Sequence, residues 1–376
     1  REAGRWFAVS SGSGPRREDG LTGHLPLDAA NALVELAPLP LVIAANVAVG
    51  KSYAKTATWI VGGVAAWGIA ASGLIDLTSV LASTNVSQDK FAIDAGSIVS
   101  GVAAGGFLLR PIRRDVAMFL PIDPDNPVHA LALVLAVVLF GTQLTSLVFT
   151  DVLSALDRQP PQRILDTFLD ELPLALLALA GVGLFVRRKA ADAAGRLGLI
   201  RPAWWHLALA PAAAGVFLAL LTGFDSANHA FFPGLAKHID STDSHLFSQL
   251  ANSNAAGIAA LALLPGICED LLFRGALQPR IGLVPAALLF TSIHSQYAIS
   301  LDLAGIFAIA ICLGLIRKYA NTTTSITAHV AYNLLAALTL TGAVLYVAVV
   351  LEGVLVLVVG YGIWNQMRRS GAPVGP

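Results

Sequence analysis

The stretch AALALLPGICEDLLFRGAL, residues 259–277, combines a membrane-like apolar run with three charged side chains. It carries the adjacent acids Glu269 and Asp270 and, four residues later, Arg274. A charged side chain near the middle of a bilayer costs at least roughly 2.5 to 3.5 kcal/mol, so such residues usually pair with one another or face a wet cavity. The stretch therefore predicts a transmembrane helix that contains a polar site.

The composition of the whole chain is that of a membrane protein. Of its 376 residues, 56% are hydrophobic and 13% are charged, against about 25% charged in soluble proteins, and the mean hydropathy is +0.70. We therefore predict an all-helical, polytopic integral membrane bundle with about 10 to 11 transmembrane helices. Windows of about 20 residues predict segments at 32–49, 57–82, 91–109, 128–150, 172–186, 203–223, 252–278, 285–299, 301–316, 325–342 and 345–364. Because Pro38, Pro40 and Glu35 interrupt the first segment, ten spans and one re-entrant or interfacial piece are the alternative.

The charges indicate an orientation. The chain balances 24 basic against 24 acidic residues, so it lacks the basic footprint of a nucleic-acid-binding protein. Four short basic runs fall on one side of the membrane under the eleven-segment topology, and the positive-inside rule makes that side cytosolic. We expect a multi-pass protein of the cell membrane, with the segment 225–245 in an outside loop. The runs contain Arg110, Arg113 and Arg114; Arg187, Arg188 and Lys189; Arg317 and Lys318; and Arg368 and Arg369.

Polar residues divide the chain near residue 200. We interpret residues 1–30, which are rich in Gly, Ser and Arg, as a loose N-terminal tail. Residues 31–200 carry scattered acids and are predicted to form an accessory transmembrane bundle. Residues 201–365 hold the dense polar set and are predicted to be the functional core, and residues 366–376 are a cytosolic tail. The two cysteines, Cys268 and Cys312, are too few for a disulfide framework or a Cys-rich metal site.

Two further motifs lie in the same third of the chain: Phe290 with His294, and His329 with Asn333. Residues four apart share one face of a helix. At 1.5 Å per residue, Glu269, His294 and His329 all lie roughly 12 to 15 Å from the predicted cytosolic end of their segments, so we expect them in one layer.

The two adjacent acids should have different partners. Glu269 is rotated about 100° from Asp270 around the helix. One acid can therefore pair with Arg274 while the other faces an incoming histidine. Each motif alone can also be purely structural. The acids with Arg274 could form a buried ion pair, His294 could be a hydrogen-bonded interhelical histidine, and His329 with Asn333 could join membrane helices by polar contacts. Their agreement in depth is what favours a common site.

The three ordered motifs resemble those of the CPBP intramembrane proteases, the CAAX-protease and bacteriocin-processing (Abi) group. EDLLFRGALQPR at 269–280, FTSIH at 290–294 and HVAYN at 329–333 carry the resemblance, which covers roughly residues 250–345. Asp270 stands where the family usually has a second Glu. The shorter side chain puts its bond to Arg274 in question.

This resemblance implies an intramembrane endopeptidase that uses water rather than a protein nucleophile. Glu269 would be the general base and His294 would hold the water. His329 and Asn333 would stabilise the oxyanion, with Asp270, Arg274 and Phe290 in support. No cofactor is implied. The substrates would be membrane-embedded or lipid-anchored peptides, such as prenylated tails or bacteriocin-like leaders, that enter a cavity open toward the cytosol.

A divalent metal such as zinc is the mechanistic alternative. Glu269, His294 and His329 are ligand types that zinc accepts, and three protein ligands with one water form the usual catalytic site. No His-Glu-x-x-His helix is present. We interpret the polar residues of the predicted outside loop as solvated rather than metal-binding. These are His229, His238, His245, Asp240 and Asp243.

Two other functions compete with proteolysis. Intramembrane acids can form the proton relay of a proton-coupled transporter, although the repeated halves of many transporters are not evident. Alternatively, the polar groups lock the helices of a non-catalytic scaffold. The acids that would serve a relay are Asp76, Asp94, Asp302 and Glu352.

Overall fold

A computed structural model of the chain describes residues 35–82, 87–252, 254–338 and 342–370. The predicted tail 1–30 lies outside them. Within the described residues the regular elements are helices, which confirms the all-helical fold class. The first half contains α2 Pro38–Ala48, α3 Ala54–Leu81, α4 Gln88–Gly105, α5 Arg110–Ala117, α6 Pro127–Phe149, α7 Val152–Leu156, α8 Ile164–Gly181 and α9 Ala190–Leu197. The second half contains α10 His206–Phe231, α11 Pro233–Leu246, α12 Ser248–Asn252, α13 Asn254–Asp270, the π-helix η3 Leu271–Leu277, α14 Gln278–Ile281, α15 Leu283–Ser292, α16 Leu301–Tyr319, α17 Thr322–Ala336 and α18 Gly342–Ser370.

Each of the eleven predicted segments coincides with a helix. Six stretches of the described chain are long and apolar enough to cross a membrane: Ala54–Leu81, Gln88–Leu108, Pro127–Phe149, His206–Phe231, Ala255–Ile281 and Tyr346–Arg368. The remaining predicted segments correspond to the shorter helices α2, α8, α15, α16 and α17. The chain is therefore a multi-pass membrane bundle.

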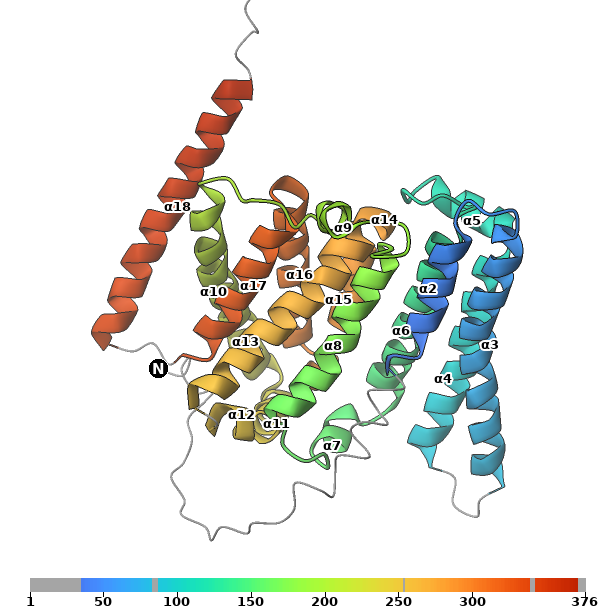
Figure 1. Cartoon of the computed structure of the whole chain (residues 1–376). Helices are drawn as coiled ribbons and strands as arrows, with labels where there is room; N and C mark the ends of the chain where they lie inside the picture. The colour runs from blue at the N-terminus through green and yellow to red at the C-terminus, as the bar shows by residue number, and fades with distance from the viewer. Residues whose placement is uncertain (1–34, 83–86, 253, 339–341, 371–376) are drawn as a thin grey trace, which may run out of the picture.

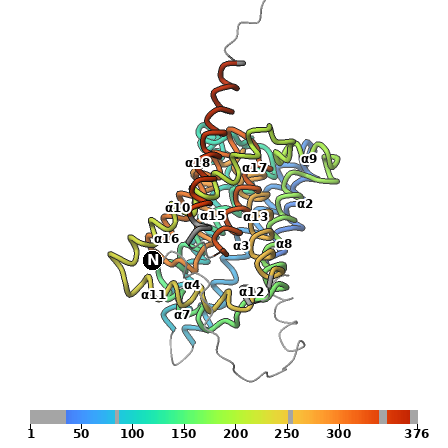
Figure 2. The backbone as a smooth tube through the Cα atoms, turned by 90° about the vertical axis from the view of Figure 1, so that its left-hand side faces the viewer, coloured from blue at the N-terminus to red at the C-terminus, as the bar shows by residue number. Residues whose placement is uncertain are grey.

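The helices are arranged in two groups with α8 between them (Figure 1). On one side lie α2, α3, α4 and α6, and on the other α10, α13, α16 and α17, while α18 leans away at the far edge. Seen from the side, α18 also extends beyond the other helices (Figure 2). α13 packs against both α8 and α17, so it occupies the centre of the molecule.

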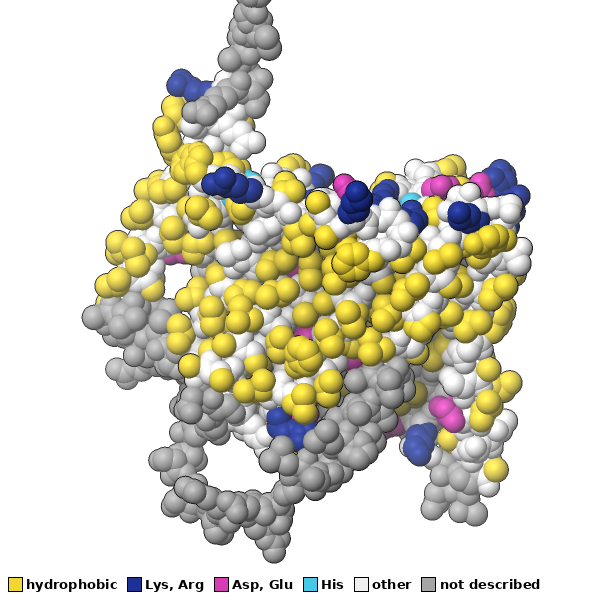
Figure 3. Space-filling model, viewed as in Figure 1, with side chains coloured by type: hydrophobic (Ala, Val, Ile, Leu, Met, Phe, Trp, Pro, Cys, Tyr) yellow, Lys and Arg dark blue, Asp and Glu magenta, His cyan; other side chains and the backbone are white. Residues whose placement is uncertain are grey.

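The basic runs gather at one end of the bundle, as predicted. α5, α9 and the last turns of α16 and α18 all lie at this end in Figure 1. A space-filling view shows a row of Lys and Arg side chains there, above a broad apolar belt (Figure 3). We refer to it as the basic end. Its assignment to the cytosol remains a prediction.

The predicted outside loop at 225–245 is wrong, because this segment is helical. α10 continues to Phe231, and Pro233 at the first turn starts α11. Pro is favoured at that position because its missing N–H has no partner there in any helix. The buried residues of α11 recur with helical spacing: Ala236, Ile239, Thr242, Asp243 and Leu246.

Candidate active site

The acidic pair lies where α13 changes its helical form. α13 ends at Asp270 and continues directly as η3, a seven-residue π-helix that contains Arg274. Such π-turns are rare and frequently occur at functional sites. Asp270 is fully buried, and its Oδ1 lies 3.0 Å from Nη1 of Arg274. The shorter Asp side chain therefore reaches Arg274, and Ser325 donates a second contact to Asp270 Oδ2 at 2.5 Å.

Glu269 points away from Arg274, toward two histidines. Its Oε1 lies 4.0 Å from Nε2 of His294, and its Oε2 lies 3.9 Å from Nε2 of His329. Both separations are longer than a direct hydrogen bond. Oε2 is buried and has no hydrogen-bond partner among the described residues. The carboxylate thus sits between two imidazoles with room for a small bridging group.

His294 lies in an irregular turn rather than on a helix. α15 ends at Ser292, earlier than the predicted boundary of 299. The hydroxyls of Thr291 and Ser292 donate to the carbonyls of Ala287 and Leu289, both at 2.8 Å. Such side chains compete with the backbone for its acceptors at a helix terminus.

The hydrogen bond of His294 defines its tautomer. Nδ1 lies 2.8 Å from the Phe290 carbonyl oxygen. A carbonyl can only accept, so Nδ1 carries the proton and Nε2 of a neutral ring is an acceptor. That acceptor faces Glu269.

His329 contacts both acids. While Nε2 faces Glu269, Nδ1 lies 3.4 Å from Asp270 Oδ1. Sequence reasoning gave Asp270 only one partner, Arg274, and missed both Ser325 and His329. One turn further along α17, the half-buried Asn333 lines the same cavity as Glu269 and His329.

Phe290 packs among these polar groups. The Arg274 guanidinium lies 3.9 Å from the centre of the Phe290 ring, the geometry of a cation–π contact. The ring is buried, and it also contacts Phe273, His294 and His329, with ring centres 5.5, 4.6 and 5.9 Å away. Phe290 thereby fixes the relative positions of the ion pair and both histidines.

The site opens into a cavity of about 2450 Å³. Glu269, His294, His329 and Asn333 line it, together with the irregular segment 293–297. Non-helical backbone at membrane depth is tolerated where it borders a cavity. The walls come from both halves of the chain, including α2, α6 and α8 as well as α10, α17 and α18.

This arrangement agrees with a comparison to known protein families. Residues 251–335 match the family model of the type II CAAX prenyl endopeptidase Rce1-like proteins. The matched segment contains all three motifs and confirms the resemblance to the CAAX-protease group. No significant match was found among curated proteins or solved structures.

One acidic residue of the cavity was not predicted. Glu171 of α8 lines the cavity, its Oε2 is buried without a hydrogen-bond partner among the described residues, and its charge interacts with that of Glu269. The sequence contains one sign of this residue, because Glu171 stands two residues before Pro173 at the start of an apolar run. The predicted segment began at residue 172 and so excluded it.

The acids that could form the proton relay of a transporter lie in different parts of the structure. Asp302 accepts a hydrogen bond from Asn228 at 2.5 Å, Asp94 is buried on α4, and Glu352 of α18 lines the cavity. Of the four acids, Glu352 thus is the one that lines the same cavity as Glu269.

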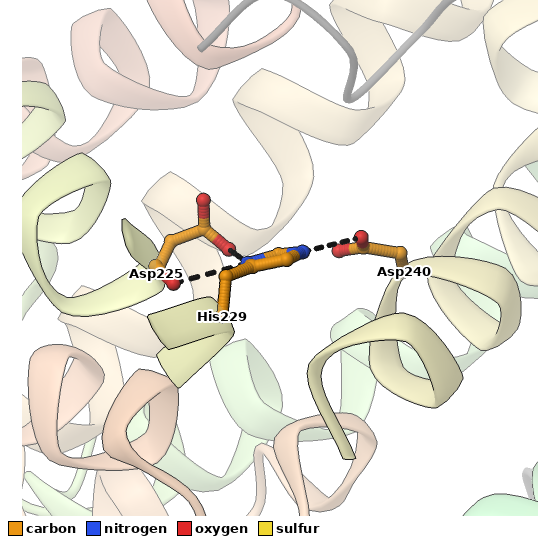
Figure 4. A group of neighbouring side chains, drawn as sticks. All are labelled: Asp225, His229 and Asp240. Carbon is orange, nitrogen blue, oxygen red and sulfur yellow. Dashed lines mark hydrogen bonds and ion pairs between the residues drawn. The ribbon is translucent and has the colours of Figure 1, made fainter. Parts of the chain in front are cut away.

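A second polar cluster joins α10 to α11 (Figure 4). Nδ1 of His229 lies 3.1 Å from Asp225 Oδ1, and Nε2 lies 3.0 Å from Asp240 Oδ2. The three groups are close enough to be considered as metal ligands, but the ring lies between the two acids with each nitrogen directed at an oxygen. This is the geometry of a doubly protonated imidazole that bridges two carboxylates. The other histidines diverge, since His238 pairs with Asp157 and His245 with the Gln159 carbonyl, both at 2.8 Å.

Proposed function

We propose that this chain is an intramembrane endopeptidase that hydrolyses peptide bonds in membrane-embedded or lipid-anchored substrates. The observation that carries the proposal is the Glu269 carboxylate, held 4.0 and 3.9 Å from two imidazoles at the wall of a large cavity. The match to CAAX prenyl endopeptidases supports a prenylated peptide as the first substrate to test.

In the proposed reaction, one water binds between Glu269 and His294. It donates one hydrogen to the carboxylate and the other to the free Nε2 of His294. Glu269 takes a proton as the water oxygen attacks the peptide carbonyl. When the tetrahedral intermediate collapses, the carbon–nitrogen bond breaks and Glu269 returns that proton to the leaving amine.

His329 and Asn333 would stabilise the negative oxygen of the intermediate. Nδ1 of His329 lies beside Asp270, and Nε2 would donate to the oxyanion when it carries a proton. The Asn333 side-chain amide offers a second donor at the same wall. Loss of one such donor typically costs about 2.7 to 4 kcal/mol of transition-state stabilisation.

The set of Glu269, His294 and His329 is also chemically suitable for zinc. The pairing of His294 with the Phe290 carbonyl leaves Nε2 free to accept from a water or to ligate a metal, so metal removal is the experiment that separates the two mechanisms. We further propose that the basic end faces the cytosol, as the positive-inside rule predicts, and that the cavity opens on this side, because arginines of that end line it.

The test is cleavage of a farnesylated peptide by the purified protein in liposomes, read by mass spectrometry. Cleavage should be lost in Glu269→Gln and in His294→Ala, while thermal unfolding shows that both variants remain folded. Cleavage that persists in both variants would refute the proposal. Substrate-coupled proton flux that survives both changes would instead support a transporter.

A further inference from the structure

A second, smaller pocket lies in the first half of the chain, between the start of α3 and the start of α5. Both helix starts lie at the basic end (Figure 1). The pocket has a volume of about 290 Å³, close to the lower limit of about 300 Å³ for small-molecule sites. None of its lining residues also lines the large cavity. The pocket is therefore a separate site, of a size that suits a small headgroup rather than a peptide.

The lining of this pocket carries an excess of positive charge. It contains three cationic side chains, Lys55, Arg110 and Arg113, and one carboxylate, Asp125. Asp125 pairs with Arg110, accepting from Nε at 2.6 Å and also from Nη2. In the described part of the chain, neither Lys55 nor Arg113 forms an ion pair with a carboxylate. Two positive charges thus remain unbalanced.

Arg113 is built into the wall of the pocket. Its side chain is buried, and it donates to the carbonyls of Phe107, Leu108 and Pro124, each at 2.7 Å. These carbonyls accept from its N–H groups but do not cancel its charge, and an arginine stays protonated in proteins. Charges interact more strongly where water is excluded. The fold therefore leaves a fixed positive charge at this wall.

Two helix N-termini add to the positive potential. Leu109, Arg110 and Pro111, which line the pocket, are the N-cap and the first two residues of α5. Lys55 is the second residue of α3. Neither helix start has a side-chain cap. The free backbone N–H groups and the dipole of a helix N-terminus favour a bound anion such as phosphate.

The surface next to the pocket indicates that this phosphate belongs to a lipid. Trp59, which lines the pocket, is 52% exposed, and Trp67, two turns further along α3, is 50% exposed. Gly63 lies between them, and a Cβ there would lie 3.6 Å from the Trp67 ring. Residues four apart share one helix face, so an apolar strip leads from the pocket into the apolar belt of the bundle (Figure 3). An acyl chain attached to a bound headgroup would follow this strip.

We propose that this pocket binds the phosphate of an anionic phospholipid through Lys55, Arg110 and Arg113. One acyl chain lies along Trp59 and Trp67. The site belongs to the predicted accessory bundle and does not depend on the proposed endopeptidase function.

The test is lipid binding to the purified protein, measured by native mass spectrometry with dioleoylphosphatidylglycerol and dioleoylphosphatidylcholine. We expect the anionic lipid to bind at least about tenfold tighter, and Lys55→Gln with Arg110→Gln to remove that preference, because charge-assisted hydrogen bonds are lost. The double variant should remain folded, since the ion pair of Arg110 with Asp125 is exposed and such pairs contribute little to stability. Lys51→Gln with Arg114→Gln is the matched control, because it removes the same charge from exposed positions outside the pocket.

Asp125→Asn tests the site in the opposite direction. It removes the carboxylate that competes for Arg110, so phosphatidylglycerol should bind about threefold tighter, the equivalent of one exposed ion pair. Equal binding of the two lipids to the wild type would overturn the site. An equal loss in the pocket variant and its control would do the same, since it would indicate unspecific attraction to the basic end.

Inorganic phosphate separates a lipid from a soluble anion. At equal concentration it should not displace phosphatidylglycerol, because it has no acyl chain to contact α3. Displacement would show that the pocket binds a free anion and would overturn the lipid assignment. Trp59→Ala should weaken the binding of phosphatidylglycerol, and unchanged binding would exclude the proposed path of the acyl chain.

Discussion

Oε1 of Glu269 lies 4.0 Å from Nε2 of His294, and that nitrogen is an acceptor because Nδ1 is bonded to the Phe290 carbonyl. Two acceptors at this separation accommodate one water that donates about 2.8 Å hydrogen bonds to both. The pair is therefore arranged to hold a water, with the carboxylate as the proposed base.

Glu269→Gln should abolish that base without removing the side chain. We expect kcat/KM to fall by about 10² to 10⁴, the usual contribution of a general base, with little change in peptide binding. Initial rates and direct binding of an uncleaved peptide measure the two effects separately. A variant that retained more than a tenth of the wild-type rate would exclude Glu269 as the base.

Removal of metal ions should leave cleavage within twofold of the untreated protein, because the proposed water is activated by a carboxylate. The measurement is activity after dialysis against a strong zinc chelator, together with the metal content of the purified protein. Activity that disappears on chelation and returns with zinc would instead assign Glu269, His294 and His329 as ligands.

Helical periodicity made part of this site predictable. Asp270 with Arg274 and His329 with Asn333 are local pairs, so spacing along one helix was enough to place each on one face. The layer shared by Glu269, His294 and His329 followed from counting residues along apolar segments.

The remaining features depend on packing between segments. The contact of His329 with Asp270 joins α17 to α13, and Glu171 enters from α8, so neither has a local signature. The early end of α15 at Ser292 has no glycine or proline beside it that would have predicted it. Segment 225–245 was predicted to be a loop because it lies between the predicted spans 203–223 and 252–278, and its buried helix face depends on packing against other segments.

Asp270→Asn should destabilise the fold as well as the site. The change leaves the buried Arg274 without its carboxylate, and breaking a buried ion pair from one side typically costs about 3 to 5 kcal/mol. Ser325→Ala keeps the ion pair and removes the hydroxyl contacts to the same carboxylate and to the Leu313 carbonyl, and it should cost about 1.5 to 3 kcal/mol. Reversible unfolding in mixed micelles gives both values. Asp270→Glu restores the charge and should recover most of the stability. An Asp270→Asn variant as stable as the wild type would show that the Asp270–Arg274 ion pair has no structural role.

Asp157 links the chain after α7 to α11 and should make stability depend on pH. Hydrogen bonds from Thr242, at 2.6 Å, and His238 hold the pKa of Asp157 below its usual value. A carboxyl with a lowered folded-state pKa stabilises the protein above its unfolded pKa of about 3.9, and this contribution disappears as the pH falls through the folded value. The melting temperature of Asp157→Asn should thus be lower than that of the wild type at pH 7, and the difference should shrink as the pH falls below about 3.9. A difference that persisted unchanged to pH 3 would contradict this account.

Gly266 allows α17 to approach α13 closely enough for His329 to face Glu269. A Cβ at this position would lie 2.6 Å from Cγ2 of Val330 and 3.1 Å from its backbone nitrogen, so α17 would have to move. Misplacement of a catalytic group by about 1 Å can cost about 10²-fold in rate, and we expect Gly266→Ala to lower kcat/KM by this order while the protein remains folded. Gly353→Ala is the matched control, because a Cβ there meets no atom within 4 Å. Equal activity of the two glycine variants would mean that the spacing between α13 and α17 does not position His329.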